Sequence, residues 1–214
     1  MSVSKVTDDF EHFRKIQNAG IPLVFFDRIC DEIDTDRVVV DDETGAYEAV
    51  KHLLNEGCKN IVHLSGPPNL QIGQRRKDGY IRALNDQNMP VDESNIIRCD
   101  TMEEASVIVP ELLNRPVKPD GIFAVNDLTA AAAMKIVKEH GYRVPEDIAI
   151  VGFTSGLISD ITNPTLTSVE QHGYLIGREA VKLLIDRLEK KHDLPSQTII
   201  IKTKLVVKGS SKRN

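Results

Sequence analysis

The sequence lacks the features that would remove it from the ordinary soluble proteins. Its three cysteines, Cys30, Cys58 and Cys99, are odd in number, widely spaced and without a CxxC pair. Neither a disulfide framework nor a zinc site is therefore expected. No apolar run approaches the roughly 20 residues that span a bilayer, and the first residues lack the basic and apolar segments of a secretory signal. These absences predict a cytoplasmic protein with reduced thiols and no membrane partner.

An excess of positive charge is also lacking. The chain of 214 residues has a formal net charge of −5, whereas phosphate binding requires lysines and arginines clustered on one face. Short basic clusters occur at residues 75–77, 189–191 and 211–213. A solvated helix end and a chain tail explain the last two better than phosphate contacts do. The sequence therefore argues against this chain gripping a nucleic acid by itself.

The motifs that would identify an enzyme are missing as well. No GxGxxG follows a strand, and neither GxxxxGK[ST] nor GxSxG occurs, so a dinucleotide site, a P-loop and a nucleophile elbow are unsupported. His63 falls in the middle of an apolar strand pattern, where a core histidine is expected sooner than a catalytic base. The histidines on predicted helices lack metal-ligand spacing. We therefore expect no enzyme activity, no metal and no cofactor.

What the sequence does contain is a regular alternation of short apolar runs and helical patterns. The runs predict strands at residues 22–26, 38–40, 60–65, 96–99, 122–125, 148–152 and 198–207, and the helical spacing predicts helices at 42–57, 76–84, 103–114, 127–141 and 174–190. Asp42 is a candidate N-cap, and Pro110 predicts a kink or a helix start. Repeated βαβ units imply an α/β protein with parallel sheets and right-handed crossovers.

Polar residues follow several of the predicted strands at the point where each strand ends. They are Asp27, Asp100-Thr101, Asn126-Asp127 and Thr154-Ser155, with Arg76 after a turn. Ligands of open α/β sheets lie outside the carboxyl ends of the strands. Carboxylates, amides and a guanidinium beside the aromatic rings of Phe26 and Phe153 suit a sugar or similar polyol.

Each of these residues also has a purely structural interpretation. Asp127 is as well explained as the N-cap of its helix as by a ligand contact. For Asn126 a ligand role is favoured over the structural one. The alternatives for Asp27 are that it only terminates its strand or pairs with Arg28, and Arg76 could be an exposed helix residue.

Several motifs, in order along the chain, carry a resemblance to a known family. They are Gly20-Ile-Pro-Leu-Val-Phe-Phe-Asp27-Arg28, Val40-Asp41-Asp42, His63-Leu-Ser-Gly66-Pro67, Arg76-Lys-Asp-Gly79-Tyr80, Pro119-Asp-Gly-Ile-Phe-Ala-Val-Asn126-Asp127, Val144-Pro-Glu-Asp-Ile-Ala-Ile-Val-Gly152-Phe153 and Asn163-Pro-Thr-Leu-Thr-Ser-Val-Glu-Gln171. Together they resemble the effector-binding domain of LacI/GalR-family transcriptional repressors. The likeness covers nearly the whole chain.

The resemblance implies the type I periplasmic-binding-protein fold, in which two parallel-sheet α/β subdomains close on an effector. The first, incomplete subdomain is expected to comprise residues 1–58 and 170–192, and the second residues 59–169 and 193–214. Crossovers are expected near residues 58–60, 167–169 and 193–196. The helix-turn-helix DNA-binding domain of the family is expected to be absent from this chain. We expect such a fragment to be marginally stable, oligomeric or domain-swapped because of exposed sheet edges.

The resemblance also implies which residues contact the effector, carried over motif by motif. They are Phe26, Asp27, Arg76, Thr101, Asn126, Thr154 and Gln171. Two of them depart from the family pattern. Thr101 stands where relatives often have a stacking aromatic residue, and Thr154 replaces a carboxylate that commonly grips sugar hydroxyls. These departures argue against an ordinary monosaccharide and favour a phosphorylated, acidic or otherwise unusual effector.

The resulting hypothesis is the ligand-sensing domain of a cytoplasmic repressor. A small-molecule effector, a sugar or sugar derivative, would shift an open–closed equilibrium. The parent protein would be a homodimer that reaches operator DNA only through the missing N-terminal domain. One alternative is a solute-binding receptor of a transport system. Another is a hydrolase or sugar-modifying enzyme, which requires a base such as His63 beside Ser65 or Ser155 in the cleft.

Overall fold

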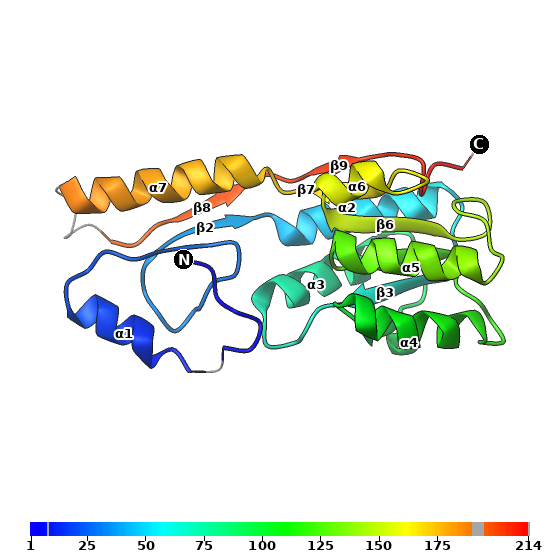
Figure 1. Ribbon diagram of the computed structural model, residues 1–214, viewed down its shortest axis with the longest axis horizontal. Coiled ribbons are helices and arrows are strands. Elements are labelled where there is room, and N and C mark those ends of the chain that lie inside the picture. The colour runs from blue at the N-terminus through cyan, green and yellow to red at the C-terminus, as the bar shows by residue number, and fades with distance from the viewer. Residues whose placement is uncertain (8, 190–194, 214) are drawn as a thin grey trace. The chain divides into compact units, whose positions relative to one another are not determined.

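The computed structural model describes residues 1–7, 9–189 and 195–213, and these form two compact units. Unit 1 comprises Met1–Asp41 and His172–Lys202, and unit 2 comprises Asp42–Gln171 and Thr203–Asn214. Each unit combines helices with a sheet of mostly parallel strands (Figure 1). The predicted α/β fold class is therefore confirmed.

Unit 1 is built on a small parallel sheet with the strand order β1-β2-β8. The strands are β1 (Val24–Phe26), β2 (Asp36–Val40) and β8 (Thr198–Ile201), and the helices are α1 (Glu11–Asn18) and α7 (Gly173–Glu189). Because side chains alternate across a strand, Val24 packs with Ile176 of α7, whereas Phe25 packs with Phe13 of α1. The two helices thus cover opposite faces of the sheet.

Unit 2 contains a larger sheet with the order β4-β3-β5-β6-β7-β9. Its strands are β3 (Ile61–Ser65), β4 (Ile96–Arg98), β5 (Gly121–Ala124), β6 (Ala149–Thr154), β7 (Thr167–Glu170) and β9 (Lys204–Val206). Its helical segments are α2 (Asp42–Asn55), α3 (Gln71–Asp86), η1 (Glu93–Asn95), α4 (Met102–Leu113), α5 (Asp127–Glu139) and α6 (Leu157–Ile161). The pairings are parallel except that of β7 with β9.

Helices cover both faces of this larger sheet. Ile122 and Ala124 of β5 pack into a core that includes residues of α4 and α5, whereas Phe123 of the same strand packs into a core that includes residues of α2 and α3. The central strands β3 and β5 are buried along their whole length. Their near-continuous apolar sequences are typical of parallel strands that are covered on both faces.

The position of α2 differs from the predicted subdomain boundaries. Residues 42–58 were expected in the first subdomain, but α2 belongs to unit 2, so the chain passes between units at residues 41–42 instead of 58–60. Close packing of α2 on α3 explains the difference. A Cβ atom at Gly79 of α3 would overlap the carbonyl oxygen of Glu43, so only glycine allows this approach.

The last predicted strand, residues 198–207, is two strands in two sheets. Residues Thr198–Ile201 pair with β2 in unit 1, and Lys204–Val206 pair with β7 in unit 2. The passages at residues 171–172 and 202–203 differ from the predicted 167–169 and 193–196. Residues 190–194 lie outside the described residues. Parts of the predicted helix end, of the predicted subdomain boundary and of the third predicted crossover fall on them.

Two predictions about helix starts also need correction. Asp42, the candidate N-cap, is itself the first residue of α2. Pro110 does not start a helix, because α4 begins at Met102 and continues through Pro110 to Leu113. The N-cap of α4 is Thr101, because its Oγ1 accepts a hydrogen bond from the Glu104 amide.

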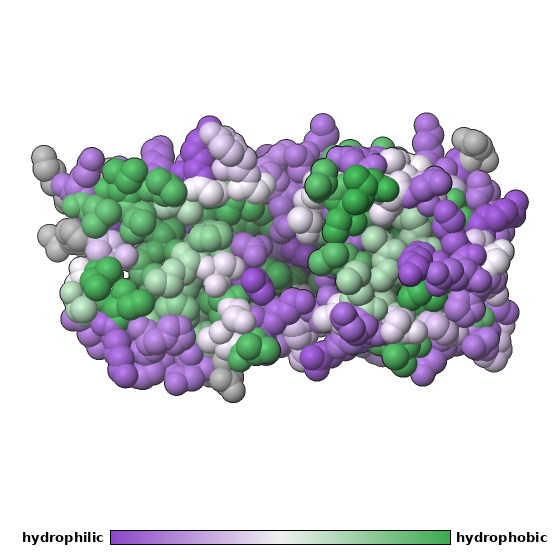
Figure 2. Space-filling model, in the orientation of Figure 1, coloured by the Kyte–Doolittle hydropathy of each residue, from purple (hydrophilic) through white to green (hydrophobic). Residues whose placement is uncertain are grey.

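Hydrophobic side chains remain on parts of the surface. Figure 2 shows them gathered over α7 and over α6. Val181 and Leu188 of α7 and Leu157 and Ile161 of α6 are exposed. Patches of this kind on a soluble protein commonly mark interaction surfaces. Within the described part of the chain, none of the helices has the length and apolar character needed to cross a bilayer.

Candidate functional site

Five strands of unit 2 end at the same edge of its sheet, because β4, β3, β5, β6 and β7 run parallel. The residues that follow these strands include Thr101 after β4, Asn126 after β5 and Gln171 after β7, and Thr154 ends β6. We refer to this set of strand ends as the carboxyl edge of unit 2. It is the edge at which open α/β sheets bind ligands.

Arg76 lies at this edge with its guanidinium buried. Its Nη1 donates to the carbonyl oxygen of Val125, the residue before Asn126, at 2.5 Å. Asp42 Oδ1 accepts from Nε at 2.7 Å and lies 2.6 Å from Nη2. Only 3% of Arg76 is exposed, so the interpretation of Arg76 as an exposed helix residue is wrong.

An aromatic ring supports the same guanidinium. The Arg76 Cζ atom lies 3.6 Å from the centroid of the Phe153 ring, within the range in which the ring quadrupole attracts a cation. Phe153 belongs to β6 and is fully buried. A planar donor group is thus held between a carboxylate, a strand-end carbonyl and a ring, which fixes its orientation before any ligand arrives.

Asn126 joins the ends of two strands. Its Nδ2 donates to the carbonyl oxygen of Asp100 beyond β4 at 3.0 Å, and its Oδ1 accepts from the Thr129 amide at 2.9 Å. Asn126 is therefore the N-cap of α5. The interpretation of Asp127 as the N-cap is wrong, because Asp127 is the first helical residue and its carboxylate contacts Ser168 and the Gly156 amide instead.

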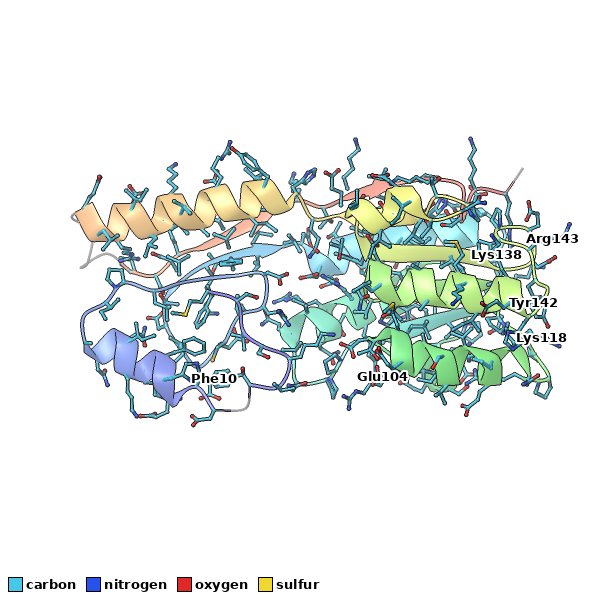
Figure 3. All side chains as sticks on the ribbon, viewed as in Figure 1. Phe10, Glu104, Lys118, Lys138, Tyr142 and Arg143 are labelled. Carbon is cyan, nitrogen blue, oxygen red and sulfur yellow. The ribbon has the colours of Figure 1, made fainter. Side chains whose placement is uncertain are left out.

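Thr101 and Glu104 shape the neighbouring strand end. Thr101 caps α4 with its hydroxyl, and the Glu104 carboxylate at the N-terminal end of α4 (Figure 3) accepts from the Asp100 amide at 2.8 Å. Thr101 is half-buried and Thr154 is exposed. Gln171, the last residue of the first chain segment of unit 2, is half-buried. Contacts of these three with an effector stay predictions.

The other two predicted contacts, Phe26 and Asp27, belong to unit 1. They lie at the carboxyl end of β1, where Asp27 donates its amide to the Val38 carbonyl at 3.1 Å. Asp27 has φ 60°, a left-handed conformation that aspartate tolerates better than most residues. Its carboxylate lies 3.7 Å from Arg28 Nε, so the predicted alternative of an Asp27–Arg28 pair is confirmed. That pairing leaves a ligand role for Asp27 open.

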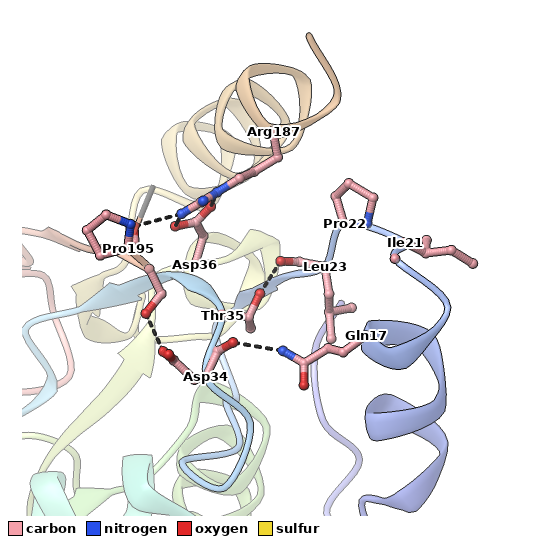
Figure 4. Close-up of a pocket in the computed structure, with 11 residues that line it drawn as sticks. Gln17, Ile21, Pro22, Leu23, Asp34, Thr35, Asp36, Arg187 and Pro195 are labelled. Atoms are coloured by element: carbon pink, nitrogen blue, oxygen red, sulfur yellow. Dashed lines mark hydrogen bonds and ion pairs between the residues drawn. The ribbon is translucent and has the colours of Figure 1, made fainter. Parts of the chain in front are cut away.

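Unit 1 also contains a cavity of about 390 Å³ at the opposite end of its strands (Figure 4). Leu23, Thr35 and Asp36, at the amino ends of β1 and β2, line it together with Gln17, Asp34, Arg187 and Ser196. Polar groups in its wall bond to one another. Arg187 binds Asp36 through Nε at 2.6 Å and Nη2 at 2.9 Å, Thr35 donates to Leu23, and Gln17 donates to Asp34.

His63 lies in the core of unit 2 and away from solvent. Its ring is stacked against Phe123 and Tyr80, with centroid distances of 4.8 and 5.4 Å. Burial lowers the pKa of His63 to about 4, and the group is fully buried. The interpretation of His63 as a core histidine is therefore confirmed.

Sequence reasoning missed two residues that organise this edge. Asp42 was assigned to a helix cap, although it is the partner of Arg76, and Ser168 was not considered, although it binds Asp127 at 2.5 Å. Both contacts join residues more than 30 positions apart. Three consecutive residues of β7 are buried, so no alternation marks Ser168, and nothing local in the sequence pairs Asp42 with Arg76.

This fold and edge define a binding domain of the open α/β type. The family model described as "Periplasmic binding protein-like domain" matches residues 50–211. The chain belongs to this family.

Similar proteins of known name are transcriptional regulators. The chain is 33% identical over 192 residues to the HTH-type transcriptional repressor CytR of Escherichia coli (strain K12), covering 89% of this chain and 56% of the repressor. It is 34% identical over 208 residues to the ribose operon repressor of Halalkalibacterium halodurans, covering 97% and 61%. The solved structure of a transcriptional regulator CelR–cellobiose complex matches with TM-score 0.87 and 31% identity, over 94% of this chain and 62% of that one.

These comparisons confirm the resemblance to LacI-family repressors, and they favour a regulator over a transport receptor. The relatives are regulators and not enzymes. The chain spans less than two thirds of the length of these two repressors.

Proposed function

We propose that the chain is the effector-binding domain of a transcriptional repressor and that its effector is a neutral polyol, a sugar or a sugar-containing molecule. The observation that carries this proposal is the buried Arg76 guanidinium, which is stacked on Phe153 and paired with Asp42 at the carboxyl edge of unit 2. A donor group whose orientation is fixed in this way suits the hydroxyl oxygens of a polyol.

The charges at this edge favour a neutral effector over the phosphorylated or acidic one that the sequence departures suggested. Asp42 Oδ1 lies 2.6 Å from the Arg76 guanidinium and offsets its charge. A phosphate placed here would meet a guanidinium that is already paired with a carboxylate. The names of two similar proteins mention ribose and cellobiose, both neutral sugars, which supports a neutral sugar as the effector.

The contacts we propose are those that the resemblance implies. From unit 2, Arg76 and Asn126 donate to hydroxyls, and Thr101, Thr154 and Gln171 add hydroxyl and amide groups. The resemblance also implies effector contacts for Phe26 and Asp27. The geometry of unit 2 supports the first two most strongly, because both side chains are already fixed by hydrogen bonds to strand ends.

The wider role is also a proposal. In the regulator, DNA would be read by the part of the relatives' length that this chain does not cover, and effector binding would shift the populations of two states. We propose a cytoplasmic homodimer without catalytic activity or cofactor. The exposed hydrophobic residues Leu157 and Ile161 on α6 support self-association, which light scattering coupled to size-exclusion chromatography would measure.

A thermal-shift screen tests the proposed effector class. Ribose, cellobiose and a nucleoside are compared with ribose 5-phosphate, each at increasing concentration. A ligand at 100 times its Kd adds about 2.7 kcal/mol, which raises Tm by roughly 5–10 °C for a domain of this size. The expected result is a rise with a neutral compound and none with the phosphate.

Variants separate the site from unspecific stabilisation. Asn126→Ala should lose the ligand-induced rise, whereas Asn85→Ala, at an exposed position on α3, should keep it. A rise that persists in Asn126→Ala, or a stronger response to the phosphate than to the neutral sugars, would contradict the proposal.

A further inference from the structure

The loop that follows β6 is held in an unusual backbone conformation. Thr154 has φ 134° and Ser155 has φ 54°, and side chains rarely adopt either value. Two adjacent residues of this kind persist only where the surroundings over-determine them, and such positions cluster at ligand-binding sites. Thr154 is also one of the proposed effector contacts, so the fixing of this loop bears on binding.

The carboxylate of Asp127 fixes the loop through hydrogen bonds. Asp127 Oδ2 accepts a hydrogen bond from the Gly156 amide at 3.1 Å, and Oδ1 accepts from Ser168 Oγ at 2.5 Å. Ser168 Oγ in turn accepts from the Ser155 amide at 2.9 Å. Both amides that follow Thr154 are therefore tied, directly or through one hydroxyl, to Asp127.

The neighbouring strand β6 approaches this carboxylate closely at a glycine. Gly152 of β6 is in register with Ser168 of β7, and a Cβ atom at Gly152 would overlap Asp127 Oδ1. Asp127 itself is 5% exposed. The sequence thus supplies a glycine, a serine and an aspartate that meet at one point under the loop.

We propose that Asp127 is a positioning residue that sets the conformation of residues 154–156 and through it the direction of the Thr154 hydroxyl toward the effector. The neighbouring Asn126 and Asp127 then have separate tasks, since Asn126 joins strand ends and Asp127 shapes the loop. The second half of the inference rests on the proposed function, whereas the first half does not.

Amide hydrogen exchange, resolved by NMR, tests the first half without any effector. Asp127→Ala should speed exchange of the Ser155 and Gly156 amides at least tenfold. Asp127→Asn should give an intermediate value, because its single carbonyl oxygen replaces two acceptor oxygens. Val137→Ala is the matched control, since Val137 is fully buried in the same helix and distant in sequence from the loop contacts. It should leave both amides at the wild-type rate.

Calorimetric titration with the neutral sugar found in the screen tests the second half. We expect Asp127→Ala to weaken binding at least tenfold and Val137→Ala to leave it unchanged. If Asp127→Ala does not fold, Ser168→Ala and Gly152→Ala disturb the same contacts and should show the same two effects. Exchange rates like those of Val137→Ala would overturn the loop assignment, and a loosened loop with unchanged affinity would overturn the role in binding. Failure of the proposed function would be seen separately, as no binding to the unmodified chain while the loop effect remains.

Discussion

Both units bury an arginine–aspartate pair, but at opposite ends of their strands. In unit 2, Arg76 and Asp42 lie at the carboxyl edge, with side-chain exposures of 4% and 3%. In unit 1, Arg187 and Asp36 line a cavity at the amino ends, with exposures of 14% and 1%. The chemistry is the same, and the shortest nitrogen–oxygen distance is 2.6 Å in both pairs. Only the pair of unit 2 lies at the carboxyl ends of parallel strands, the edge at which open α/β sheets bind ligands.

The comparison teaches that a buried ion pair alone does not define a binding site. Removing two charges from water is costly, and a pair of this kind is weak evidence even for stability. In unit 1, Arg187 donates to the backbone carbonyl of Pro195, and the Asp36 carboxylate accepts from the backbone amide of Gln197. In unit 2 the Arg76 guanidinium packs on the buried ring of Phe153 and bonds to the carbonyl of Val125, next to Asn126, whose side-chain amide lies at the same edge.

The largest effect that would test this comparison is expected for Arg76→Ala. The substitution leaves Asp42 buried without its partner, and we expect unfolding free energy to fall by about 3–5 kcal/mol together with loss of effector binding. Urea denaturation measures the first and calorimetry the second. The double variant Asp42→Asn/Arg76→Met should recover most of the stability and none of the binding. Wild-type affinity in the double variant would contradict a ligand role for Arg76.

Arg187→Ala is the matched change in unit 1. It leaves the buried carboxylate of Asp36 without its cationic partner, so we expect a loss of about 3 kcal/mol in unfolding free energy. Binding, measured by calorimetry well below the new Tm, should keep the wild-type Kd. A Kd that weakens as much as in Arg76→Ala would show that the two pairs are functionally equivalent.

Acid should weaken the two units in different pH ranges. The folded pKa of His63 is about 4 and its ordinary value is 6.5, so the unfolded chain binds more protons between these values and stability falls as pH decreases from 6.5 to 4. The full difference is about 3 kcal/mol. Although burial opposes it, hydrogen bonds from Arg187 and Gln197 hold the pKa of Asp36 below its ordinary 3.8, so its contribution is lost only below that value.

The variant His63→Phe isolates the contribution of unit 2. It keeps an aromatic ring between Tyr80 and Phe123 and removes the titrating group. Urea midpoints measured from pH 7.5 to 4.5 should fall less steeply than in the wild type. An unchanged slope would contradict the assignment of this pH dependence to His63.

The smallest effects are expected from two glycines in helices. Ala at Gly79 would force α3 away from α2, where the backbone of Glu43 is too close for a Cβ atom, and should cost about 1–3 kcal/mol. Ala at Gly177 of α7 meets no heavy atom within 4 Å and should stabilise by about 0.5–1 kcal/mol. Thermal unfolding of the two variants gives the sign directly, and equal signs would contradict the packing described.

The order of strands and helices could be predicted from the sequence because it depends on local patterns. The apolar run at residues 122–125 and the helical spacing after Asp127 are local signals, and both elements are present. The grouping of elements into units could not be predicted in the same way. The assignment of α2 depends on contact between Gly79 and Glu43, and Ile199 and Leu205 are equally apolar although they enter different sheets.

The candidate site was predictable at the level of its edge and not of its contacts. Polar residues after Asp100, Val125 and Phe153 pointed to one edge of the sheet, because parallel strands end together, and this is the edge at which open α/β sheets bind ligands. The choice of Asn126 over Asp127 as N-cap could not be read locally, since both residue types cap helices well. The choice depends on Ser168, 41 residues further along the chain, because its hydroxyl donates a hydrogen bond to the Asp127 carboxylate.

The location of the effector is the central claim, and chemical-shift mapping tests it most directly. The uniformly ¹⁵N-labelled chain is titrated with the neutral sugar that gives the largest thermal shift. We predict the largest changes at the side-chain amides of Asn126 and Gln171 and at the backbone amides of Thr101 and Thr154. Changes centred on Leu23, Thr35 and Arg187 around the unit 1 cavity, with the carboxyl edge of unit 2 unaffected, would contradict the account.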